Sequence, residues 1–317
     1  MAVYTHVSAE AASALLTRYD VGKMIALKGI AEGVENSNYM LETDQSRFIL
    51  TLYENRVDPG DLPYFHGLLA HLHKNHCLVP RFIDDCDGQW LQDVAGRKGC
   101  LIEFLSGVSV SEPDATTAFN VGKALASMHV AVDGFAQSRP NQMGLLSWRP
   151  LFEKCDMVQS EAFFPQLHGM IAKECDFLEG NWPTGLPQSA IHADLFPDNV
   201  LTLDGAVTGL IDFYFACTDA RAYDLAITHC AWSFSADGQR YNPDIGDAIL
   251  NGYLAVIELD ADEKAALPIL ARGACLRFLL TRLYDWINTP AEALVSRKDP
   301  IAFWRRLQYY TAQGLTV

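Results

Sequence analysis

The feature that most constrains this chain is a polar run in its second half that is followed, at a fixed distance, by one more aspartate. The run reads His192-Ala193-Asp194-Leu195-Phe196-Pro197-Asp198-Asn199, so that Asp194 and Asn199 stand five positions apart within one loop. Two short apolar stretches come next, joined by Asp204-Gly205, a dipeptide typical of hairpin turns. The hairpin would return Asp212 to the neighbourhood of Asn199.

These side chains suit phosphoryl transfer. An attacking hydroxyl needs a carboxylate that orients it and accepts its proton, and Mg²⁺ bound to phosphates takes hard oxygen ligands such as an amide and a carboxylate. We therefore predict that Asp194 is the base and that Asn199 and Asp212 hold the metal. His192 is expected to hydrogen-bond the backbone and brace the loop rather than transfer a proton. Each string alone is common in turns, but together at this spacing they favour metal-dependent phosphotransfer.

The remainder of the chain divides into a strand-rich first part and a helix-rich second part. Apolar runs and turn residues in the first part predict two hairpins, at residues 24–53 and at 90–105 with a turn at 96–99. They also predict one helix at 62–76, with Asp61 as its N-cap. From Ser111 onward the apolar spacing predicts mainly helices, starting with 111–130, in which Phe119, Leu125 and Met128 are spaced for one buried face. We expect an α+β fold of two lobes, with an N-terminal nucleotide-binding lobe at 1–102, a hinge at 103–107 and a catalytic and substrate lobe at 108–317.

Composition excludes several classes of protein. The net charge of −15 argues against nucleic acid or an anionic membrane as a partner, because both need a basic surface. No apolar run is long enough to span a bilayer, and the start of the chain has no pattern of a secretion signal. The eight cysteines lack the spacing of a zinc site. We expect reduced thiols in a cytoplasmic protein of unspecified oligomeric state.

The sequence resembles the aminoglycoside phosphotransferase and choline kinase family. The resemblance covers nearly the whole chain and is carried by 192–199, by Asp212-Phe213 and by Tyr223-Asp224-Leu225-Ala226. It implies a protein-kinase-like fold with ATP in the cleft between the lobes. The positions that match the family's nucleotide loop and adenine hinge are Gly33, Asn36, Ser37, Asn38, Glu103 and Leu105. By the same analogy Asp224 is a structural capping carboxylate.

Within that family the sequence is most similar to the bacterial homoserine kinases built on this fold. The stretches 33–39, 48–54 and 192–200 carry this similarity, together with Leu276-Arg277-Phe278 and Thr281-Arg282-Leu283. It implies ATP-dependent phosphorylation of the side-chain hydroxyl of L-homoserine to O-phospho-L-homoserine, a step of threonine biosynthesis.

The sequence departs from the usual pattern of this fold on the phosphate side of the nucleotide site. Most kinases of this fold carry a lysine on the third strand, paired with a helix glutamate. Here Thr51 stands at the aligned position, and the predicted helix 62–76 contains no glutamate. Nucleotide binding would then depend on Mg²⁺ and on donors of the loop around Gly33.

The substrate itself makes further demands. Homoserine is a zwitterion whose carboxylate favours an arginine and whose ammonium favours a carboxylate. From Ala271 onward the chain has seven basic residues and only three acidic ones, which disfavours a polycationic substrate. Arg277 and Arg282 lie on an apolar predicted helix and are either carboxylate ligands or structural ion pairs. Tyr214 and Asp219 are weaker candidates for the hydroxyl and the ammonium.

Two alternatives remain open at this stage. The first is a kinase of the same fold for another small alcohol, such as an aminoglycoside, choline or a related amine. The second is a non-catalytic binding module of this fold, which the missing lysine and glutamate suggest.

Overall fold

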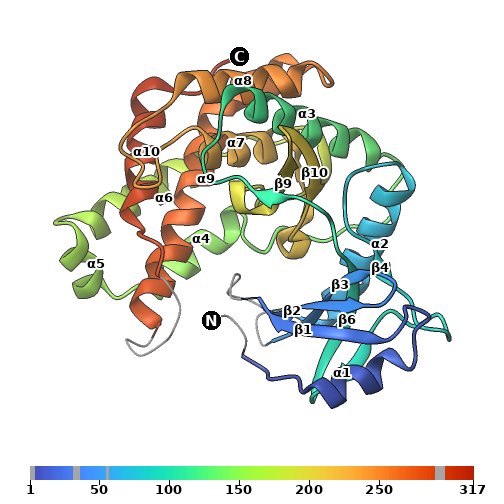
Figure 1. Cartoon of the computed structure of the whole chain (residues 1–317). Helices are drawn as coiled ribbons and strands as arrows, with labels where there is room; N and C mark the ends of the chain where they lie inside the picture. The colour runs from blue at the N-terminus through green and yellow to red at the C-terminus, as the bar shows by residue number, and fades with distance from the viewer. Residues whose placement is uncertain (1–3, 31–35, 55–56, 290–296) are drawn as a thin grey trace. The chain divides into compact units, whose positions relative to one another are not determined.

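Residues 1–106 and 107–317 form two units of different character. The structure is a computed structural model that describes residues 4–30, 36–54, 57–289 and 297–317. Figure 1 shows strands as the main element of the first unit and helices as the main element of the second. The predicted α+β architecture, β-rich first and mainly helical second, is confirmed.

The first unit is built on one antiparallel sheet of six strands. Five strands follow the order β1-β2-β3-β6-β4, and β5 pairs with β6 outside that path. The strands are β1 (Met24–Gly29), β2 (Asn36–Thr43), β3 (Arg47–Tyr53), β4 (Phe82–Ile83), β5 (Gln92–Val94) and β6 (Arg97–Glu103). In this register Thr51 on β3 lies between Asn38 on β2 and Cys100 on β6.

Two helices accompany this sheet, α1 (Ala9–Leu16) and α2 (Leu62–Lys74). Helix α1 was not predicted from the sequence; it buries Leu15 and Leu16 in the same hydrophobic cluster as the inward residues of β2 and β3. Helix α2 was predicted, but the Asp61 side chain does not cap it. Asp58 instead caps the short turn η1 (Pro59–Asp61) that leads into the helix.

The hairpin between β5 and β6 turns earlier than predicted. Ala95 and Gly96 take the left-handed conformation, with φ of 50° and 78°, so β6 begins at Arg97. The predicted turn at 96–99 is therefore wrong by about two positions, because Arg97, Lys98 and Gly99 pair with β5.

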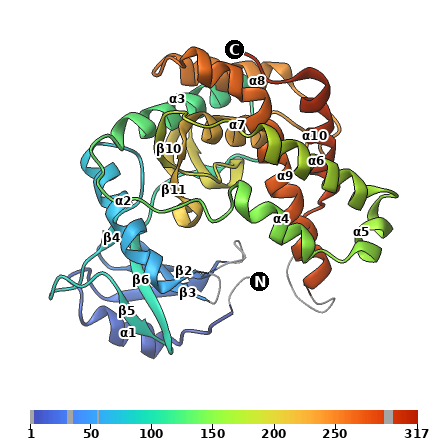
Figure 2. The same cartoon turned by 180° about the vertical axis from the view of Figure 1, so that it is seen from behind.

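The second unit contains eight α-helices among its described residues, drawn from two sides in Figures 1 and 2. Helix α9 contacts α4, α6, α7 and α10, so it is the central helix of this unit. The helices are α3 (Ala115–Ala131), α4 (Leu145–Glu153), α5 (Met157–Phe163), α6 (Leu167–Asn181), α7 (Arg221–Trp232), α8 (Pro243–Leu254), α9 (Ala261–Asn288) and α10 (Ile301–Gln313).

Helices α3 and α8 pack closely because a glycine on each meets the backbone of the other. A side chain at Gly122 would collide with the carbonyl of Ile249, and one at Gly252 with the carbonyl of Phe119. This packing uses the backbone of Phe119 while its ring stays exposed, so the prediction that Phe119 belongs to the buried face of this helix is wrong.

Two small sheets hold the loops that matter for function. Strand β8 (Gln188–Ile191) pairs with β11 (Cys217–Ala220), and β9 (Val200–Leu203) pairs with β10 (Ala206–Leu210) and β7 (Val108–Ser109). The predicted hairpin turn at Asp204-Gly205 is present, with both residues at positive φ. The polar run 192–199 therefore leaves β8 and enters β9, and Asp212 comes directly after β10.

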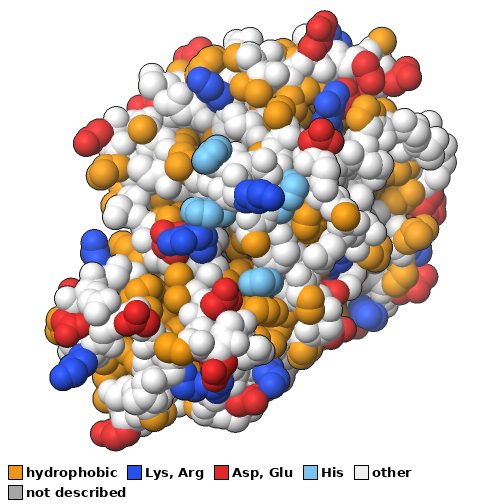
Figure 3. Space-filling model, turned by 90° about the vertical axis from the view of Figure 1, so that its right-hand side faces the viewer, with side chains coloured by type: hydrophobic (Ala, Val, Ile, Leu, Met, Phe, Trp, Pro, Cys, Tyr) orange, Lys and Arg blue, Asp and Glu red, His pale blue; other side chains and the backbone are white. Residues whose placement is uncertain are grey.

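The charged side chains of both signs lie together on the surface. On the face that Figure 3 shows, acidic and basic side chains are interspersed rather than gathered by sign. Within the described residues, no helix combines the length and the apolar character that crossing a membrane requires. The eight cysteines are all free thiols, and most of them are buried.

Candidate active site

The three residues predicted to carry the chemistry lie together in the second unit. The side-chain amide of Asn199 donates from Nδ2 to the backbone oxygen of Asp194 at 2.8 Å and to its carboxylate at 3.2 Å. The backbone N–H of Ile211 donates to the carbonyl of Asn199 at 3.0 Å, which brings the next residue, Asp212, to the same loop. The hairpin thus returns the chain as its sequence predicts.

His192 joins the two loops from inside the protein. Its Nδ1 accepts the backbone N–H of Asp194 at 3.2 Å, and its Nε2 lies 2.9 Å from the carbonyl of Ile211. A ring that accepts at Nδ1 and donates at Nε2 is the neutral tautomer. Complete burial lowers the pKa of His192, which keeps the ring neutral. Both ring nitrogens are engaged with backbone, which is the bracing arrangement expected of this residue.

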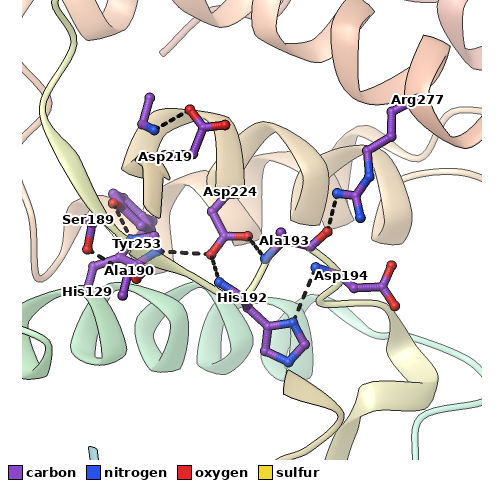
Figure 4. Close-up of polar contacts among 11 residues, drawn as sticks. His129, Ser189, Ala190, His192, Ala193, Asp194, Asp219, Asp224, Tyr253 and Arg277 are labelled. Carbon is purple, nitrogen blue, oxygen red and sulfur yellow. Dashed lines mark hydrogen bonds and ion pairs between the residues drawn. The ribbon is translucent and has the colours of Figure 1, made fainter. Parts of the chain in front are cut away.

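Asp224 holds the start of the same loop, as Figure 4 shows. Its carboxylate accepts the backbone N–H of His192 at 2.7 Å, that of Ala193 at 2.8 Å, and His129 Nε2 at 3.0 Å. Burial alone would raise the pKa of Asp224, but the hydrogen bonds and charge of its partners outweigh burial and the pKa is lowered. Asp224 is thus a fully buried carboxylate kept in its ionised form.

This role differs from the one that the sequence suggested. Helix α7 begins at Arg221 behind Ala220, and Asp224 sits in its first turn without capping the helix. The carboxylate instead caps the backbone of another segment, 31 and 32 positions earlier in the chain. Local sequence could show an aspartate at a helix start but not the loop that this aspartate would meet.

Arg277 reaches the same loop from the opposite side, also visible in Figure 4. It lies on α9, is 2% exposed, and donates from Nη1 to the carbonyl of Ala193. The N–H of Ala193 donates to Asp224, so the N–H and the carbonyl of this residue each have a charged hydrogen-bond partner. Ala193 has φ of 63°, a left-handed conformation that costs a residue with a side chain about 1 kcal/mol or more. The two charged side chains stabilise that conformation directly before Asp194.

The electrostatics of the site favour a strong base. Loss of hydration raises the pKa of Asp194 to about 8; the positive charge of Arg277 opposes this rise, and the negative charge of Asp212 adds to it. The side chain of Asp212 is partly exposed to solvent, but the surrounding protein atoms remove much of its hydration. This loss of hydration, together with the negative charge of Asp198, raises the pKa of Asp212 to about 6. A carboxylate of raised pKa is a stronger base than an ordinary aspartate, and it acts as a base in the fraction of molecules in which it is ionised.

Asn199 and Asp212 fit the predicted Mg²⁺ site by their donor chemistry. Because the Nδ2 of Asn199 is directed at Asp194, its Oδ1 is the atom left to act as a ligand. Asp212 supplies a carboxylate from a left-handed backbone position, with φ of 66°. No group of three His, Cys, Asp or Glu side chains suited to a metal occurs among the described residues. Two oxygen ligands suffice for Mg²⁺, which commonly completes its shell with water and phosphate oxygens.

The candidates for nucleotide binding in the first unit have mixed outcomes. Gly33 lies outside the described residues. Ser37 is fully buried, and its hydroxyl accepts the backbone N–H groups of Tyr4 and Thr5 and donates to Glu54. This hydroxyl therefore fixes the N-terminal segment, and the structure does not support its predicted role as a phosphate donor.

The other nucleotide candidates lie at or beside the ends of strands. Asn38 accepts the Thr51 hydroxyl through Oδ1 at 2.8 Å, which leaves its amide N–H groups for other partners. Asn36 is buried, and its Oδ1 has no partner within the described residues. The Glu103 side chain pairs with Arg81 at 3.2 Å at the end of β6, and Leu105 follows in the irregular segment.

The four substrate candidates differ in their surroundings. Asp219, on β11, accepts the side-chain amide of Asn141 at 2.7 Å and its own neighbour's N–H. Tyr214 is half-buried in η3 (Phe213–Phe215), two residues after Asp212. Arg277 is bound to the loop backbone, as described above. Arg282 has a different environment, in which its guanidinium lies 4.4 Å from the centre of the Phe303 ring.

Two residues of the site were missed from the sequence. His129, on α3, bridges Asp224 and the Tyr253 hydroxyl, which lies 2.9 Å from its Nδ1. Trp232, on α7, donates from Nε1 to the carbonyl of Leu195 at 2.9 Å. A polar ring at a position that should be buried was the only sequence signal for either residue, and that signal does not identify the partner.

Comparisons with known proteins place this geometry in context. The chain matches the model of the phosphotransferase enzyme family over residues 26–260. A homoserine kinase of Azorhizobium caulinodans is 49% identical over 312 residues, 98% of this chain and 97% of that protein. A homoserine kinase of Rhizobium johnstonii is 49% identical over 310 residues, 98% of this chain and 96% of that protein.

Solved structures share the fold at much lower identity. An amicoumacin kinase superimposes with a TM-score of 0.73 at 14% identity, covering 98% of this chain and 95% of that one. A microcompartment-associated aminopropanol kinase gives a TM-score of 0.71 at 18% identity, covering 97% of this chain and 99% of that one. The protein-kinase-like two-lobed fold expected from the sequence is thereby confirmed.

Proposed function

Because the chain belongs to the phosphotransferase enzyme family and, at nearly half identity over its whole length, to the homoserine kinases within it, we propose that it phosphorylates L-homoserine. The γ-phosphoryl group of ATP would pass to the side-chain hydroxyl, giving O-phospho-L-homoserine and ADP. This product is an activated alcohol, consistent with a place in threonine biosynthesis.

The observation that carries this proposal is the assembly of Asp194, Asn199 and Asp212 on two loops that are held together by His192. The backbone before Asp194 is bound on one side by Asp224 and on the other by Arg277. Such bracing suits a catalytic group, because a displacement of about 1 Å can lower a rate about 10²-fold.

In the reaction, Asp194 would orient the substrate hydroxyl and accept its proton while the oxygen forms a bond to the γ-phosphorus. The bond from that phosphorus to the oxygen bridging the β- and γ-phosphates breaks, and ADP leaves in line. Asn199 and Asp212 would hold Mg²⁺, which when bound supplies positive charge to the phosphate oxygens. No covalent enzyme intermediate is needed.

For the nucleotide, we propose backbone groups of 103–105 for adenine and donors of the 33–38 segment for the phosphates. Asn38 supports this assignment because its amide N–H groups are directed away from the bond with Thr51. Thr51 stands where a lysine is usual in this fold, so Mg²⁺ carries more of the charge neutralisation here.

The cellular setting follows from the same proposal. We infer a cytoplasmic enzyme that acts on small molecules, and the eight free thiols support a reducing compartment. A protein with a net charge of −15 is not expected to bind nucleic acid.

The experiment is a panel of small alcohols in an assay of ADP release with Mg²⁺ and ATP. L-homoserine, choline, 3-aminopropan-1-ol and kanamycin sample the substrate classes that this fold supports. Turnover of L-homoserine with the highest kcat/KM is the expected result. Preference for choline, kanamycin or the amino alcohol would replace the proposed substrate, and absence of turnover with all four would favour a binding module.

A further inference from the structure

Two arginines on the central helix α9 differ in how their charges are used. Arg277 is buried against the catalytic loop and donates to the carbonyl of Ala193. Arg282 lies five positions further along the helix and is half-buried. Its contacts within the described residues are the ring of Phe303 at 4.4 Å and the backbone carbonyl of Asp299 at 3.5 Å. Neither of these contacts neutralises a guanidinium.

Two other arginines of the second unit form ion pairs with carboxylates. Arg221 makes two bonds of 2.7 Å to Glu263, and Arg272 makes two bonds of 2.7 and 2.8 Å to Glu174. Arg306, buried near Arg282, donates to the carbonyls of Cys230 and Ser235, but its Nε has no partner and it forms no ion pair with a described carboxylate. Arg282 forms no ion pair with any described carboxylate, so its fork of donors remains available for an anion.

The surroundings of Arg282 make its charge costly. Burial lowers the pKa of Arg282 to about 10 and the charge of Arg306 adds to this, whereas the carboxylates of Asp194 and Asp198 oppose it. The guanidiniums of Arg282 and Arg306 both lie over the ring of Phe303, at 4.4 and 4.5 Å from its centre. A partly desolvated cation beside another cation is stabilised by an anionic partner.

The position of Arg282 is also tied to the catalytic loop. Phe196, two residues after Asp194, packs edge-on against Phe278 with ring centres 4.8 Å apart. The ring centres of Phe278 and Phe303 are 5.1 Å apart, and the guanidinium of Arg282 lies over the ring of Phe303. The ring of Phe196 also lies 6.1 Å from that of Phe303, so the three rings form one cluster within the second unit that connects the loop of the base with the guanidinium.

We propose that Arg282 binds the α-carboxylate of the amino-acid substrate and thereby selects an amino acid over a plain amino alcohol. The inference rests on the proposed function and assigns one residue to its specificity. When the flat face of a guanidinium stacks on an aromatic ring, its N–H groups point outward from the edge. Two of these N–H groups can then donate parallel hydrogen bonds to the two oxygens of a carboxylate. The Asp194 carboxylate would at the same time orient the hydroxyl at the other end of the substrate.

The test compares two substrates that differ only in the carboxylate. Replacing the carboxylate of homoserine by hydrogen gives 3-aminopropan-1-ol, which keeps the ammonium and the hydroxyl. In Arg282→Gln, kcat/KM for L-homoserine is expected to fall about 10²-fold, the effect of losing a charge-assisted pair. For 3-aminopropan-1-ol it should change by less than about threefold. An equal loss on both substrates, or no loss on homoserine, overturns the assignment.

Two further variants separate specificity from structure. Arg305→Gln, on neighbouring α10, removes a guanidinium that donates to the carbonyl of Asp237, and it should leave both substrates unaffected. Arg282→Lys keeps the charge without the fork and should restore part of the activity on homoserine. If Arg282→Gln fails to fold, the ratio of the two substrates in Arg282→Lys decides, because a structural role would leave this ratio at the wild-type value.

A binding measurement replaces the kinetic comparison where 3-aminopropan-1-ol is a poor substrate. If 3-aminopropan-1-ol turns over too slowly to measure, L-2-aminobutanoate is used as a competitive inhibitor, because it has the carboxylate and lacks the hydroxyl. Its inhibition constant should rise about 10²-fold in Arg282→Gln, and an unchanged constant overturns the assignment. Wild-type inactivity on homoserine would refute the proposed function and this inference together. Wild-type activity with an unchanged substrate ratio in Arg282→Gln would refute the inference alone.

Discussion

The imidazole of His192 lies 2.9 Å from the carbonyl oxygen of Ile211 through its Nε2. This bond connects the loop that carries Asp194 to the residue directly before Asp212. The proposed base and one proposed metal ligand are therefore connected by a side chain whose two ring nitrogens both bond backbone groups.

Removal of this connection should lower turnover without abolishing the fold. In His192→Leu the two loops lose their bridge, and we expect kcat to fall about 10²-fold because the base and the metal ligands are no longer aligned. His192→Asn, which keeps a donor near the carbonyl, should retain more activity. Steady-state kinetics at saturating ATP and homoserine measure the effect, and circular dichroism checks the fold. Wild-type kcat in His192→Leu would contradict a positioning role.

Replacement of the base should affect chemistry and leave nucleotide binding in place. Asp194→Asn keeps the shape and loses the proton acceptor, so kcat is expected to fall about 10²- to 10⁴-fold. The Kd for ATP with Mg²⁺, measured by calorimetry, should change little. Turnover close to that of the wild type would show that another group accepts the proton.

The proposed metal ligand makes a different prediction. Asp212→Ala removes a carboxylate that would bind Mg²⁺, so the variant should bind ATP equally weakly with Mg²⁺ and with EDTA. The wild type should bind ATP more tightly with Mg²⁺ present. Calorimetric titrations under both conditions measure this, and a preserved Mg²⁺ dependence in Asp212→Ala would exclude the residue as a ligand. Asp204→Ala, in the exposed hairpin turn, serves as a control for loss of an aspartate.

His229 should make stability depend on pH. Its ring is buried on α7, its Nδ1 lies 2.6 Å from the Tyr310 hydroxyl, and burial lowers its pKa to about 3. The unfolded chain has a histidine pKa of about 6.5, so the unfolded state binds more protons between about pH 6.5 and 3. The stability from the neutral ring is therefore present above about pH 6.5 and is lost as the pH falls towards 3.

Urea unfolding at several pH values between 7 and 4 tests this dependence. The free energy of unfolding of the wild type should fall with decreasing pH, and His229 contributes up to about 1.4 kcal/mol per pH unit. In His229→Gln the slope should be shallower by about that amount. Identical slopes for the two proteins would show that the ring does not control the acid sensitivity.

The parts of this site that depend on neighbouring residues of the chain could be predicted from the sequence. The turn at Asp204-Gly205 needs two residues that tolerate positive φ, and that requirement is visible in the sequence. The return of Asp212 to the loop of Asp194 and Asn199 follows from that one turn. Helix α1 is only eight residues long, and the cluster that buries Leu15 and Leu16 is formed with strands that come later in the chain.

Long-range partners are the part that sequence could not supply. Asp224 and His129 are 95 positions apart, and Arg277 meets Ala193 across 84 positions. Each of these residues has an ordinary local explanation, such as a helix start or a buried polar residue. Only the packing of α3, α7 and α9 around β8 decides which of them meet. Ser37 illustrates the reverse case, because a loop serine that seemed available is taken up by the N-terminal segment.

The hydrogen bonds of Asp224 have a consequence for motion. The amides of His192 and Ala193 donate to a carboxylate on α7, which is bound in turn by His129 on α3 and, through it, by Tyr253 on α8. Exchange of these amides with solvent deuterium requires their bonds to the buried Asp224 carboxylate to open, and that carboxylate is itself held by contacts from neighbouring helices. Their exchange should therefore be as slow as that of the helical core, so that this catalytic loop shares the protection of the protein's interior rather than the mobility usual for a loop.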